Sequence, residues 1–562
     1  MKKLLFLVFT SIFLVQCIAI KSTSTSTSEA QNYNAKSYTT SAEQRPNLVV
    51  GIVVDQMRYD YLIRFYNKYG NGGFKRLMND GYNLENVHYN YIPTYTAVGH
   101  TSIYTGTTPE NHGIISNDWY DKYLKKSIYC VDDDTYKTIG APSGGNKSPQ
   151  RMLTTTITDQ LHLAQNMKGK TIGIAIKDRS AILPAGHTAN AAYWFEGGNE
   201  GKFISSSFYM NQLPEWVQQF NNSGKANNYL NEVWDTYYNI STYTETLPDN
   251  NEFEGLFKGK DTPTFPYNLA ELRKLNDNFS LIKGIPAGNS ITTDFAEAAI
   301  IGENLGKSSA TDFLAISYSS TDYVGHKFGV NAKELEDTYI RLDKDIERLL
   351  NFLDDKVGEN NYTIFLTADH AAVLVPAYLN SIKIPGGYFD APKFAEYVNS
   401  ITSKYFNSTE LVENISNYQI FLNKEKINSL NLNEHEVAQK IADEIINFEN
   451  VYKSITAYSL QTTSFTSGIL QTLQKGYNQK LSGDVLFIPN PSTVTYSKTG
   501  TTHGSGYSYD THVPLIFYGK GIKNGKSDVY YPITNIAPTM ASLLNITEPN
   551  GCTGETIIEV LK

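Results

Sequence analysis

The sequence predicts a doubly wound α/β fold with a mostly parallel sheet and cap insertions. Three nearly continuous apolar runs, at residues 47–54, 312–317 and 362–367, have the composition of strands that are buried on both faces. Each run leads within a few residues to an aspartate, and helical patterns separate the runs. In open α/β sheets the ligand site lies beyond the carboxyl ends of the strands, so we expect the functional site at that edge.

The same patterns predict the individual elements. The run NLVVGIVV (47–54) ends at Asp55, DFLAIS (312–317) leads to Asp322, and YTIFLT (362–367) leads to Asp369 and His370. Further strands are expected at residues 171–176 and 513–518, and helices at 332–353 and 535–544. No internal repeat is evident, which favours one α/β body over a repeat architecture.

The N-terminal 20 residues have the composition of an export signal. Lys2 and Lys3 precede a mostly apolar run at residues 4–15, which is shorter than the roughly 20 residues that span a bilayer. Alternating Ser and Thr within residues 21–45 predict a flexible tether. We expect a periplasmic or otherwise exported protein without a transmembrane segment in its mature part. Cys17 leaves open a lipoprotein, in which its sulfur would be acylated.

The remaining residues, 46–562, are interpreted as one catalytic domain with two insertions. Residues 188–291 are rich in Tyr, Trp, Asn and Gly, and residues 374–497 also fit the α/β pattern poorly. Both segments lie between the blocks that hold the candidate site residues, so we expect them to form a cap over the pocket. A chain of 562 residues is long enough for several average domains, but one large α/β enzyme with insertions fits equally well.

Composition limits the classes of partner. Hydrophobic residues make up 41% and charged residues 19% of the chain, as in an ordinary folded protein. The formal net charge is -9 and there is no long Lys/Arg run, so nucleic acid is not an expected partner. Cys130 and Cys552 either pair in an oxidising compartment or remain free thiols, and they do not form a zinc site.

Three carboxylates and three imidazoles are enough to hold two zinc ions. Asp322 and His326, in STDYVGH, are four residues apart, so one helical turn would place both on the same face. The other candidates are Asp55, Asp369 and His370 at strand ends, and His503 among the small residues of TTHGS. Each has an ordinary explanation by itself, as a helix cap, a turn residue or a loop histidine. Together, in the order Asp, Asp-x3-His, Asp-His, His, they predict a two-metal site.

A more specific resemblance lies in the blocks PTYTAVGH (93–100), TSIYTG (101–106) and NHGI (111–114). With the six ligands, these blocks resemble the alkaline phosphatase superfamily of two-metal phosphoryl-transfer enzymes. In detail the chain is similar to the PafA-type phosphate-irrepressible periplasmic alkaline phosphatases of Bacteroidota. The resemblance extends from Asn47 to the segment TNIAPTM (534–540), and it implies an alkaline-phosphatase-like fold.

The resemblance implies a role for each site residue. Thr96 would be the nucleophile and would bind a metal through its oxygen. One zinc would be bound by Asp322, His326 and His503, and the other by Asp55, Asp369 and His370. Asn117, Lys177 and Arg179 would bind phosphoryl oxygens, although without the family an Asx turn and a solvated strand end explain these three better. Ala371 departs from the glycine that related enzymes commonly have, and we expect it to change only fine geometry.

The implied activity is hydrolysis of phosphate monoesters through a phosphothreonine, with release of inorganic phosphate and a broad range of small-molecule substrates. The cations Lys177 and Arg179 favour monoesters, because a diester has a second organic group where one charged oxygen would be. A nucleotide pyrophosphatase or phosphodiesterase of the same superfamily is the nearest alternative, and an inactive binding protein that retains the fold is another. A sulfatase is disfavoured because no cysteine lies in a Cys-x-Pro-x-Arg setting. We expect a monomer.

Overall fold

The computed structural model describes residues 45–562. The expected export signal, Cys17 and nearly all of the Ser/Thr tether fall on residues 1–44, outside the described residues. These features therefore stay predictions. Among residues 45–562, no helix is long and apolar enough to cross a membrane.

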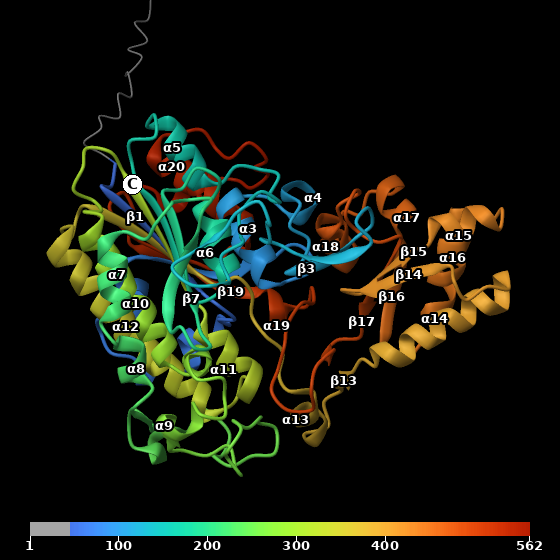
Figure 1. The fold of residues 1–562 in the computed structure, drawn as a ribbon, viewed down its shortest axis with the longest axis horizontal. Helices are drawn as coiled ribbons and strands as arrows, with labels where there is room; N and C mark the ends of the chain where they lie inside the picture. The colour runs from blue at the N-terminus through green and yellow to red at the C-terminus, as the bar shows by residue number, and fades with distance from the viewer. Residues whose placement is uncertain (1–44) are drawn as a thin grey trace, which may run out of the picture. The chain divides into compact units, whose positions relative to one another are not determined.

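An eleven-stranded sheet is the framework of the fold (Figure 1). Its middle strands are parallel and lie in the order β12 (Tyr362–Thr367), β1 (Leu48–Val54), β11 (Asp312–Tyr318), β6 (Thr171–Ala175) and β7 (Ala191–Glu196). Antiparallel strands extend the sheet on one side with β19 (His512–Gly519) and β2 (Tyr82–His88), and on the other with β8 (Lys202–Ser206) and β5 (Thr138–Ile139). Two short strands, β20 (Gly525–Ser527) and β21 (Tyr531–Pro532), pair in parallel with β2.

The three central strands determine where the site lies. Every residue of β1, β11 and β12 is buried, as their continuous apolar runs predicted. β1 pairs in parallel on both sides, so that Val53 lies opposite Ser317 of β11 and Thr367 of β12. The carboxyl ends of the three strands therefore lie at the same edge of the sheet.

Helices cover both faces of the sheet, which makes the fold doubly wound (Figure 1). One face carries α3 (Thr96–Thr105), α5 (Ile157–Ala164), α6 (Asp178–Ala185) and α20 (Ile536–Leu544). The other carries α7 (Glu215–Asn222), α10 (Ala287–Gly302), α11 (Ser320–Phe328) and α12 (Lys333–Lys356). Shorter helices near the N-terminal strands are α1 (Asp60–Arg64), α2 (Phe74–Asp80) and α4 (Pro109–His112). The predicted doubly wound α/β class is confirmed.

The segment 188–291 differs at its start from the expected cap insertion. Its first two strands, β7 and β8, continue the main sheet, because AAYWFE is a buried parallel strand next to β6. After α7 come α8 (Lys225–Tyr229), β9 (Val233–Trp234), β10 (Tyr267–Asn268) and α9 (Leu269–Leu272). The aromatic residues that marked this segment pack together: Trp234 and Tyr267 stack at 5.0 Å and both contact Phe328 of α11. This part therefore packs against the catalytic body.

The segment 374–497 builds a sheet of its own. Four antiparallel strands lie in the order β14 (Val412–Ser416), β15 (Gln419–Leu422), β17 (Val485–Pro489) and β16 (Val451–Thr456). Side chains of α14 (Ala391–Phe406) and α16 (Glu434–Ile445) pack with it into a separate hydrophobic cluster. The remaining elements are α13 (Pro376–Ser381), β13 (Gly387–Tyr388), α15 (Lys424–Ser429), α17 (Ala457–Thr462), α18 (Gly468–Gly476) and β18 (Thr493–Val494). Most of this segment therefore folds around its own core.

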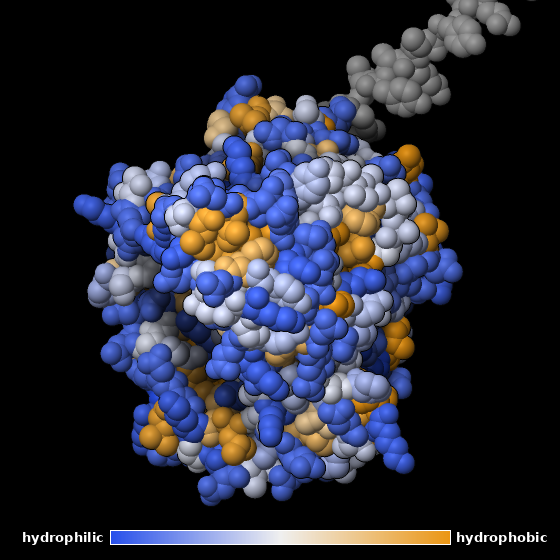
Figure 2. Space-filling model, turned by 90° about the vertical axis from the view of Figure 1, so that its right-hand side faces the viewer, coloured by the Kyte–Doolittle hydropathy of each residue, from blue (hydrophilic) through white to orange (hydrophobic). Residues whose placement is uncertain are grey.

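Figure 2 shows the face that lies on the right of Figure 1, where hydrophilic residues predominate and hydrophobic ones form separate patches. The two cysteines of the described part of the chain are both free. Cys130 is buried in a hydrophobic cluster, whereas Cys552 lies beside Gly106 at the end of α3. Of the two states that the sequence left open, the structure has the free thiols.

Candidate active site

The carboxyl edge of the central strands collects the candidate ligands. They come from the ends of β1 (Asp55) and β12 (Asp369 and His370), from α11 after β11 (Asp322 and His326), and from the loop before β19 (His503). His503 reaches this edge because β19 runs antiparallel to β12, so that the start of β19 lies beside the end of β12. Lys177 follows β6, the next strand along, and precedes the first residue of α6.

Asp55, Asp369 and His370 form the first cluster of possible metal ligands. All three side chains are fully buried. The Nε2 atom of His370 lies 3.5 Å from Oδ1 of Asp55 and 3.5 Å from Oδ2 of Asp369. Both of these carboxylate oxygens are buried and have no hydrogen-bond partner. A buried carboxylate oxygen without a partner is costly, so this cluster has the character of a cation site.

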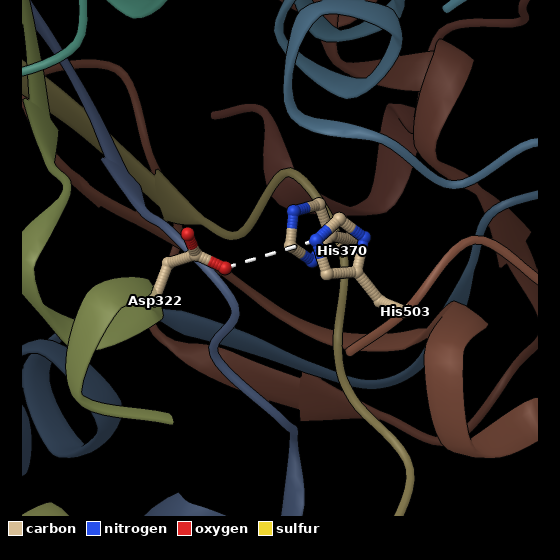
Figure 3. A group of neighbouring side chains, drawn as sticks. All are labelled: Asp322, His370 and His503. Atoms are coloured by element: carbon tan, nitrogen blue, oxygen red, sulfur yellow. Dashed lines mark ion pairs between the residues drawn. The ribbon is translucent and has the colours of Figure 1, made fainter. Parts of the chain in front are cut away.

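Asp322, His326 and His503 lie directly beside it. Oδ1 of Asp322 is 3.1 Å from Nε2 of His326 and 3.7 Å from Nε2 of His503. Figure 3 shows the Asp322 carboxylate, from α11, pointing toward the rings of His370 and His503, and its dashed line marks the Asp322–His503 pair. Those two rings are stacked with centroids 3.4 Å apart. His370 therefore lies between the two groups, and the six predicted ligands form one continuous cluster.

Each histidine of the cluster is oriented by a backbone carbonyl. The Nδ1 atoms of His326, His370 and His503 lie 2.7, 3.0 and 2.7 Å from the carbonyl oxygens of Thr501, Ala371 and Thr94. A carbonyl only accepts, so each Nδ1 carries the proton and each Nε2 presents a lone pair to the cluster. Burial lowers the pKa of His503 to about 3 and that of His370 well below its usual value, whereas at His326 burial is outweighed by the Asp322 carboxylate, which raises the pKa of that imidazole. Neutral imidazoles held in this way are the form that binds metals.

The carboxylates carry a concentrated negative charge. Burial and the neighbouring Asp369 raise the pKa of Asp55 well above its usual value, and burial raises the pKa of Asp369 to about 7. Burial also opposes ionisation of Asp322, but His326 and Lys177 hold its pKa well below the usual value. Positive charge favours the ionised form of these acids, and among the described residues the Lys177 ammonium, between Asp55 and Asp322, supplies some of it.

Thr96 is the first residue of α3 and is 1% exposed. Its Oγ1 lies 3.4 Å from Nε2 of His370 and 3.5 Å from Nζ of Lys177. The N-terminus of a helix carries partial positive charge, which favours negative charge on this oxygen. His100, one turn along α3, contacts the Thr96 carbonyl through Nδ1 at 2.9 Å and fixes the first turn. The hydroxyl is thereby held against the ligand cluster.

The three predicted phosphoryl-binding residues have different surroundings. The Lys177 ammonium lies between Oδ2 of Asp55 at 2.7 Å and Oδ2 of Asp322 at 2.5 Å. The side-chain oxygen of Asn117 accepts from the backbone N–H of Ala97 at 2.9 Å, which places its amide beside Thr96. Arg179 makes no direct contact with the ligand cluster, although its charge helps to lower the pKa of His100. Lys177 therefore lies next to the Thr96 oxygen and Asn117 contacts the residue that follows Thr96. Arg179 instead contacts Tyr129.

Gln56 is a site residue that the sequence analysis missed. Its side-chain amide donates to Oδ1 of Asp322 at 2.6 Å, and its backbone N–H donates to Oδ1 of Asp369 at 3.1 Å. Its backbone is left-handed, with φ 64°, which a residue other than glycine rarely adopts. Gly325 leaves room for this side chain, because a Cβ there would lie 1.9 Å from the Gln56 side-chain oxygen and the amide would have to move. A glutamine after a strand-end aspartate gives no signal of this role.

Ala371, the departure from the expected pattern, is accommodated without strain. Its φ is not positive, so the position does not require glycine. Its backbone N–H donates to the carbonyl of Asp510 at 2.9 Å, and its methyl group is buried in the main hydrophobic core. The loop that carries Asp369 and His370 therefore keeps its ligands with alanine at this position.

Comparison with known proteins identifies the family. The type I phosphodiesterase / nucleotide pyrophosphatase family matches residues 49–513. The chain is 44% identical to the alkaline phosphatase PafA of Elizabethkingia meningoseptica, over 93% of this chain and 96% of that protein. It is 43% identical to the alkaline phosphatase PhoV of Synechococcus elongatus, over 97% of this chain and 99% of that protein. The chain belongs to the type I phosphodiesterase / nucleotide pyrophosphatase family and, within it, to the PafA-type alkaline phosphatases.

Solved structures agree with the family. The crystal structure of wild-type PafA has a TM-score of 0.89 and 44% identity, and the match covers 92% of this chain and 99% of that chain. Mouse ectonucleotide pyrophosphatase / phosphodiesterase 5 has a TM-score of 0.50 at 14% identity, over 89% of this chain and 95% of that chain, and shows the shared fold alone. The predicted alkaline-phosphatase-like fold is confirmed. Among the described residues, two groups could hold a metal ion: Asp55, Asp369 and His370, and Asp322, His370 and His503. His370 belongs to both groups, and the predicted ligand His326 lies outside them.

Proposed function

We propose that the protein is a phosphate monoester hydrolase that works through a phosphothreonine at Thr96 and a two-zinc site. The position of the Thr96 hydroxyl carries the proposal. It lies at a helix N-terminus, within 3.5 Å of both an Nε2 of the ligand cluster and the Lys177 ammonium. The proposed nucleophile, Thr96 Oγ1, thus lies next to both a candidate metal ligand and a cation that could bind a phosphoryl oxygen. The relatives named alkaline phosphatases support the same activity.

The side chains of the cluster fit two zinc ions. Imidazoles and carboxylates are donors that zinc prefers, and Oδ1 of Asp55 and Oδ2 of Asp369 are buried without a hydrogen-bond partner. We assign Asp322, His326 and His503 to one ion, and Asp55, Thr96, Asp369 and His370 to the other. When bound, the two ions would supply positive charge to the attacking and leaving oxygens.

The Thr96 oxygen would form the new bond in the first step. It gives up its hydroxyl proton to solvent and attacks phosphorus, the ester P–O bond opposite to it breaks, and the leaving alkoxide takes a proton from solvent. In the second step a water molecule attacks the phosphothreonine and loses a proton to solvent, the bond between Thr96 Oγ1 and phosphorus breaks, Oγ1 takes up a proton again, and inorganic phosphate is released. The amide of Asn117 and the N-terminus of α3 would hold the phosphoryl group in place during both steps.

The charge around the phosphoryl group would select the substrate class. A monoester dianion has three non-bridging oxygens, and Asn117, Lys177 and Arg179 would bind those that the ions do not. A diester has an organic group in place of one charged oxygen, so the two cationic side chains would face a neutral substituent. Charge-assisted hydrogen bonds are about twice as strong as neutral ones, which favours the monoester. We therefore propose small phosphate monoesters of many kinds as substrates.

A phosphodiesterase or nucleotide pyrophosphatase is the alternative, because the matching family has that description. The buried ammonium of Lys177, 3.5 Å from the proposed nucleophile, argues against it, since it places a positive charge where the second ester group of a diester would lie. An inactive binding protein would need a missing ligand or nucleophile, and the sequence retains every candidate residue.

We further propose that the protein acts outside the cytoplasm, as a monomer. The first 20 residues would be its export signal and residues 21–45 a tether, with acylation of Cys17 as the alternative form of the mature N-terminus. Residues 46–562 would be the catalytic domain, and the segment 374–497 together with the part of 188–291 that follows β8 would form its cap. Mass spectrometry of the mature protein tests this: a first residue beyond Cys17 would exclude the lipid anchor.

Assays with p-nitrophenyl phosphate and bis-p-nitrophenyl phosphate, with and without EDTA, test the proposed function. We expect kcat/KM for the monoester to exceed that for the diester by about 100-fold or more, loss of activity with EDTA, and recovery with zinc at about two ions per chain. Thr96→Ala is expected to lower kcat by about 1000-fold or more, since it removes the proposed attacking hydroxyl. Equal rates on the two esters would support the diesterase, and full turnover in the Thr96→Ala variant would exclude the phosphothreonine.

A further inference from the structure

A hydrogen-bonded triad surrounds Arg179, the phosphoryl-binding candidate that does not touch the ligand cluster. Nη1 of Arg179 donates to the hydroxyl of Tyr129 at 2.9 Å, and that hydroxyl donates to Oδ1 of Asp178 at 2.6 Å. The same Asp178 oxygen accepts the backbone N–H of Arg179 at 2.6 Å. The guanidinium is therefore connected to the start of its own helix, α6, through one phenol hydroxyl.

Tyr129 belongs to a second element that also positions Asn117. It is the last residue of β4 (Lys126–Tyr129), which pairs with β3 (Asp118–Asp121) in a hairpin that begins directly after Asn117. The backbone N–H of Cys130 donates to the carbonyl of Asn117 at 2.9 Å. Two consecutive residues, Tyr129 and Cys130, thus hold the two phosphoryl-binding candidates that lie furthest from the metal ligands.

The triad is supported by another charge. Nζ of Lys147 lies 3.4 Å from Oδ2 of Asp178 and 4.7 Å from the centre of the Tyr129 ring. The Asp178 carboxylate therefore faces Lys147 with Oδ2 and accepts the Tyr129 hydroxyl with Oδ1. The ion pair with Lys147 keeps Asp178 in place as the acceptor for Tyr129. The Tyr129 hydroxyl then has a fixed donor direction, and its lone pair faces Arg179.

We propose that Tyr129 is a positioning residue of this enzyme, which sets the orientation of the Arg179 guanidinium toward a phosphoryl oxygen and couples it to Asn117 through the β3–β4 hairpin. The inference rests on the proposed phosphomonoesterase function. Arginine recognises phosphate through the fixed direction of its N–H groups, so its contribution depends on how firmly the plane is held. Without the Tyr129 hydroxyl, the guanidinium loses its acceptor and can rotate away.

The test is a double-mutant cycle with Tyr129→Phe and Arg179→Ala, measured on p-nitrophenyl phosphate and bis-p-nitrophenyl phosphate. Tyr129→Phe should lower monoester kcat/KM by about tenfold and raise the inhibition constant for inorganic phosphate similarly, because one hydrogen bond to a charged group is lost. Diester kcat/KM should change by less than about twofold. In the Arg179→Ala background, the Tyr129→Phe change should have almost no further effect.

Tyr209→Phe is the matched control. Tyr129 and Tyr209 pack against the same hydrophobic cluster, but the Tyr209 hydroxyl is buried without a partner. Its removal deletes the same atom without touching Arg179, so both substrates should keep their rates. Thermal unfolding of each variant shows whether the fold is retained.

Four outcomes separate the inference from the proposed function. An unchanged monoester rate in Tyr129→Phe, or an equal loss in the presence and absence of the Arg179 side chain, overturns the positioning role of Tyr129. Equal losses on monoester and diester also overturn it. If Arg179→Ala itself leaves monoester turnover and phosphate inhibition unchanged, the phosphoryl-binding role assigned to Arg179 under the proposed function fails instead.

Discussion

Gln56 offers a direct test of how the metal ligands are held. Its side-chain amide donates to Asp322 at 2.6 Å, whereas its backbone N–H donates to Asp369 at 3.1 Å. Gln56→Ala removes the first of these hydrogen bonds and keeps the second. We therefore expect the substitution to lower the affinity for the metal ion proposed at Asp322 and to leave the affinity for the ion proposed at Asp369 unchanged.

The expected magnitude follows from that single hydrogen bond. A hydrogen bond to a charged group contributes about 1.5–3 kcal/mol. At 1.36 kcal/mol for each factor of ten, zinc affinity at the Asp322 site should fall by about 10- to 100-fold. Gln56→Gly is the matched variant, since it loses the same amide but adopts φ 64° without strain. It should be more stable to unfolding than Gln56→Ala by about 1 kcal/mol, with the same loss of zinc affinity.

The assay is a zinc titration in chelator-buffered solutions, followed by metal content and by activity on p-nitrophenyl phosphate. Both variants should lose about one ion per chain at a free zinc concentration that saturates the wild type, and both should recover activity when zinc is raised. Retention of both ions with wild-type affinity in Gln56→Ala would refute the reasoning, and so would an equal loss at the two sites.

The other predictions concern charge, packing and pH. Lys177→Ala combined with Arg179→Ala should lower monoester kcat/KM about 100-fold more than diester kcat/KM, and parallel losses would contradict monoester selection. Gly99→Ala would place a Cβ 2.1 Å from the Asp369 carbonyl oxygen, so kcat at saturating zinc should fall about tenfold or more as α3 shifts; an unchanged kcat would show that the helix position is not critical. Burial and a stacked neighbouring imidazole lower the pKa of His88 to about 4, below its value of about 6.5 in the unfolded chain. The unfolded chain therefore binds more protons between these values, and stability is lost as pH falls from about 6.5 to 4. His88→Phe should reduce the slope of Tm against pH between about pH 4 and 6.5. An unchanged slope would show that groups other than His88 cause the loss of stability.

The central strands, and the candidate ligands that follow them, were predictable from the sequence because both depend on local patterns. The runs before Asp55 and Asp369 are continuous and apolar, and strands buried on both faces have that composition. The spacing of Asp322 and His326 is one helical turn, and both residues lie on α11. His503 had no such pattern. Its position depends on β19 pairing antiparallel with β12, which only the assembled sheet determines.

Other features needed three-dimensional contacts that no local pattern encodes. The start of the predicted first insertion falls on β7, a buried strand of the main sheet with three aromatic residues, Tyr193, Trp194 and Phe195, and such residues also suggested a cap. Gln56 acts through a left-handed backbone, which is unusual for glutamine and gives no signal in the sequence. Tyr129 was one tyrosine among 40, and only its hydrogen bonds distinguish it.

The parallel pairing of β1 with β11 and β12 brings together ligands that are separated by more than half of the polypeptide. No fragment that lacks either flanking strand contains a complete ion-binding pocket. Because His503 is supplied near the end of the chain, the pocket can close only after almost the whole protein has been synthesised and has folded. Capture of ions by this pocket would thus be a late event in maturation.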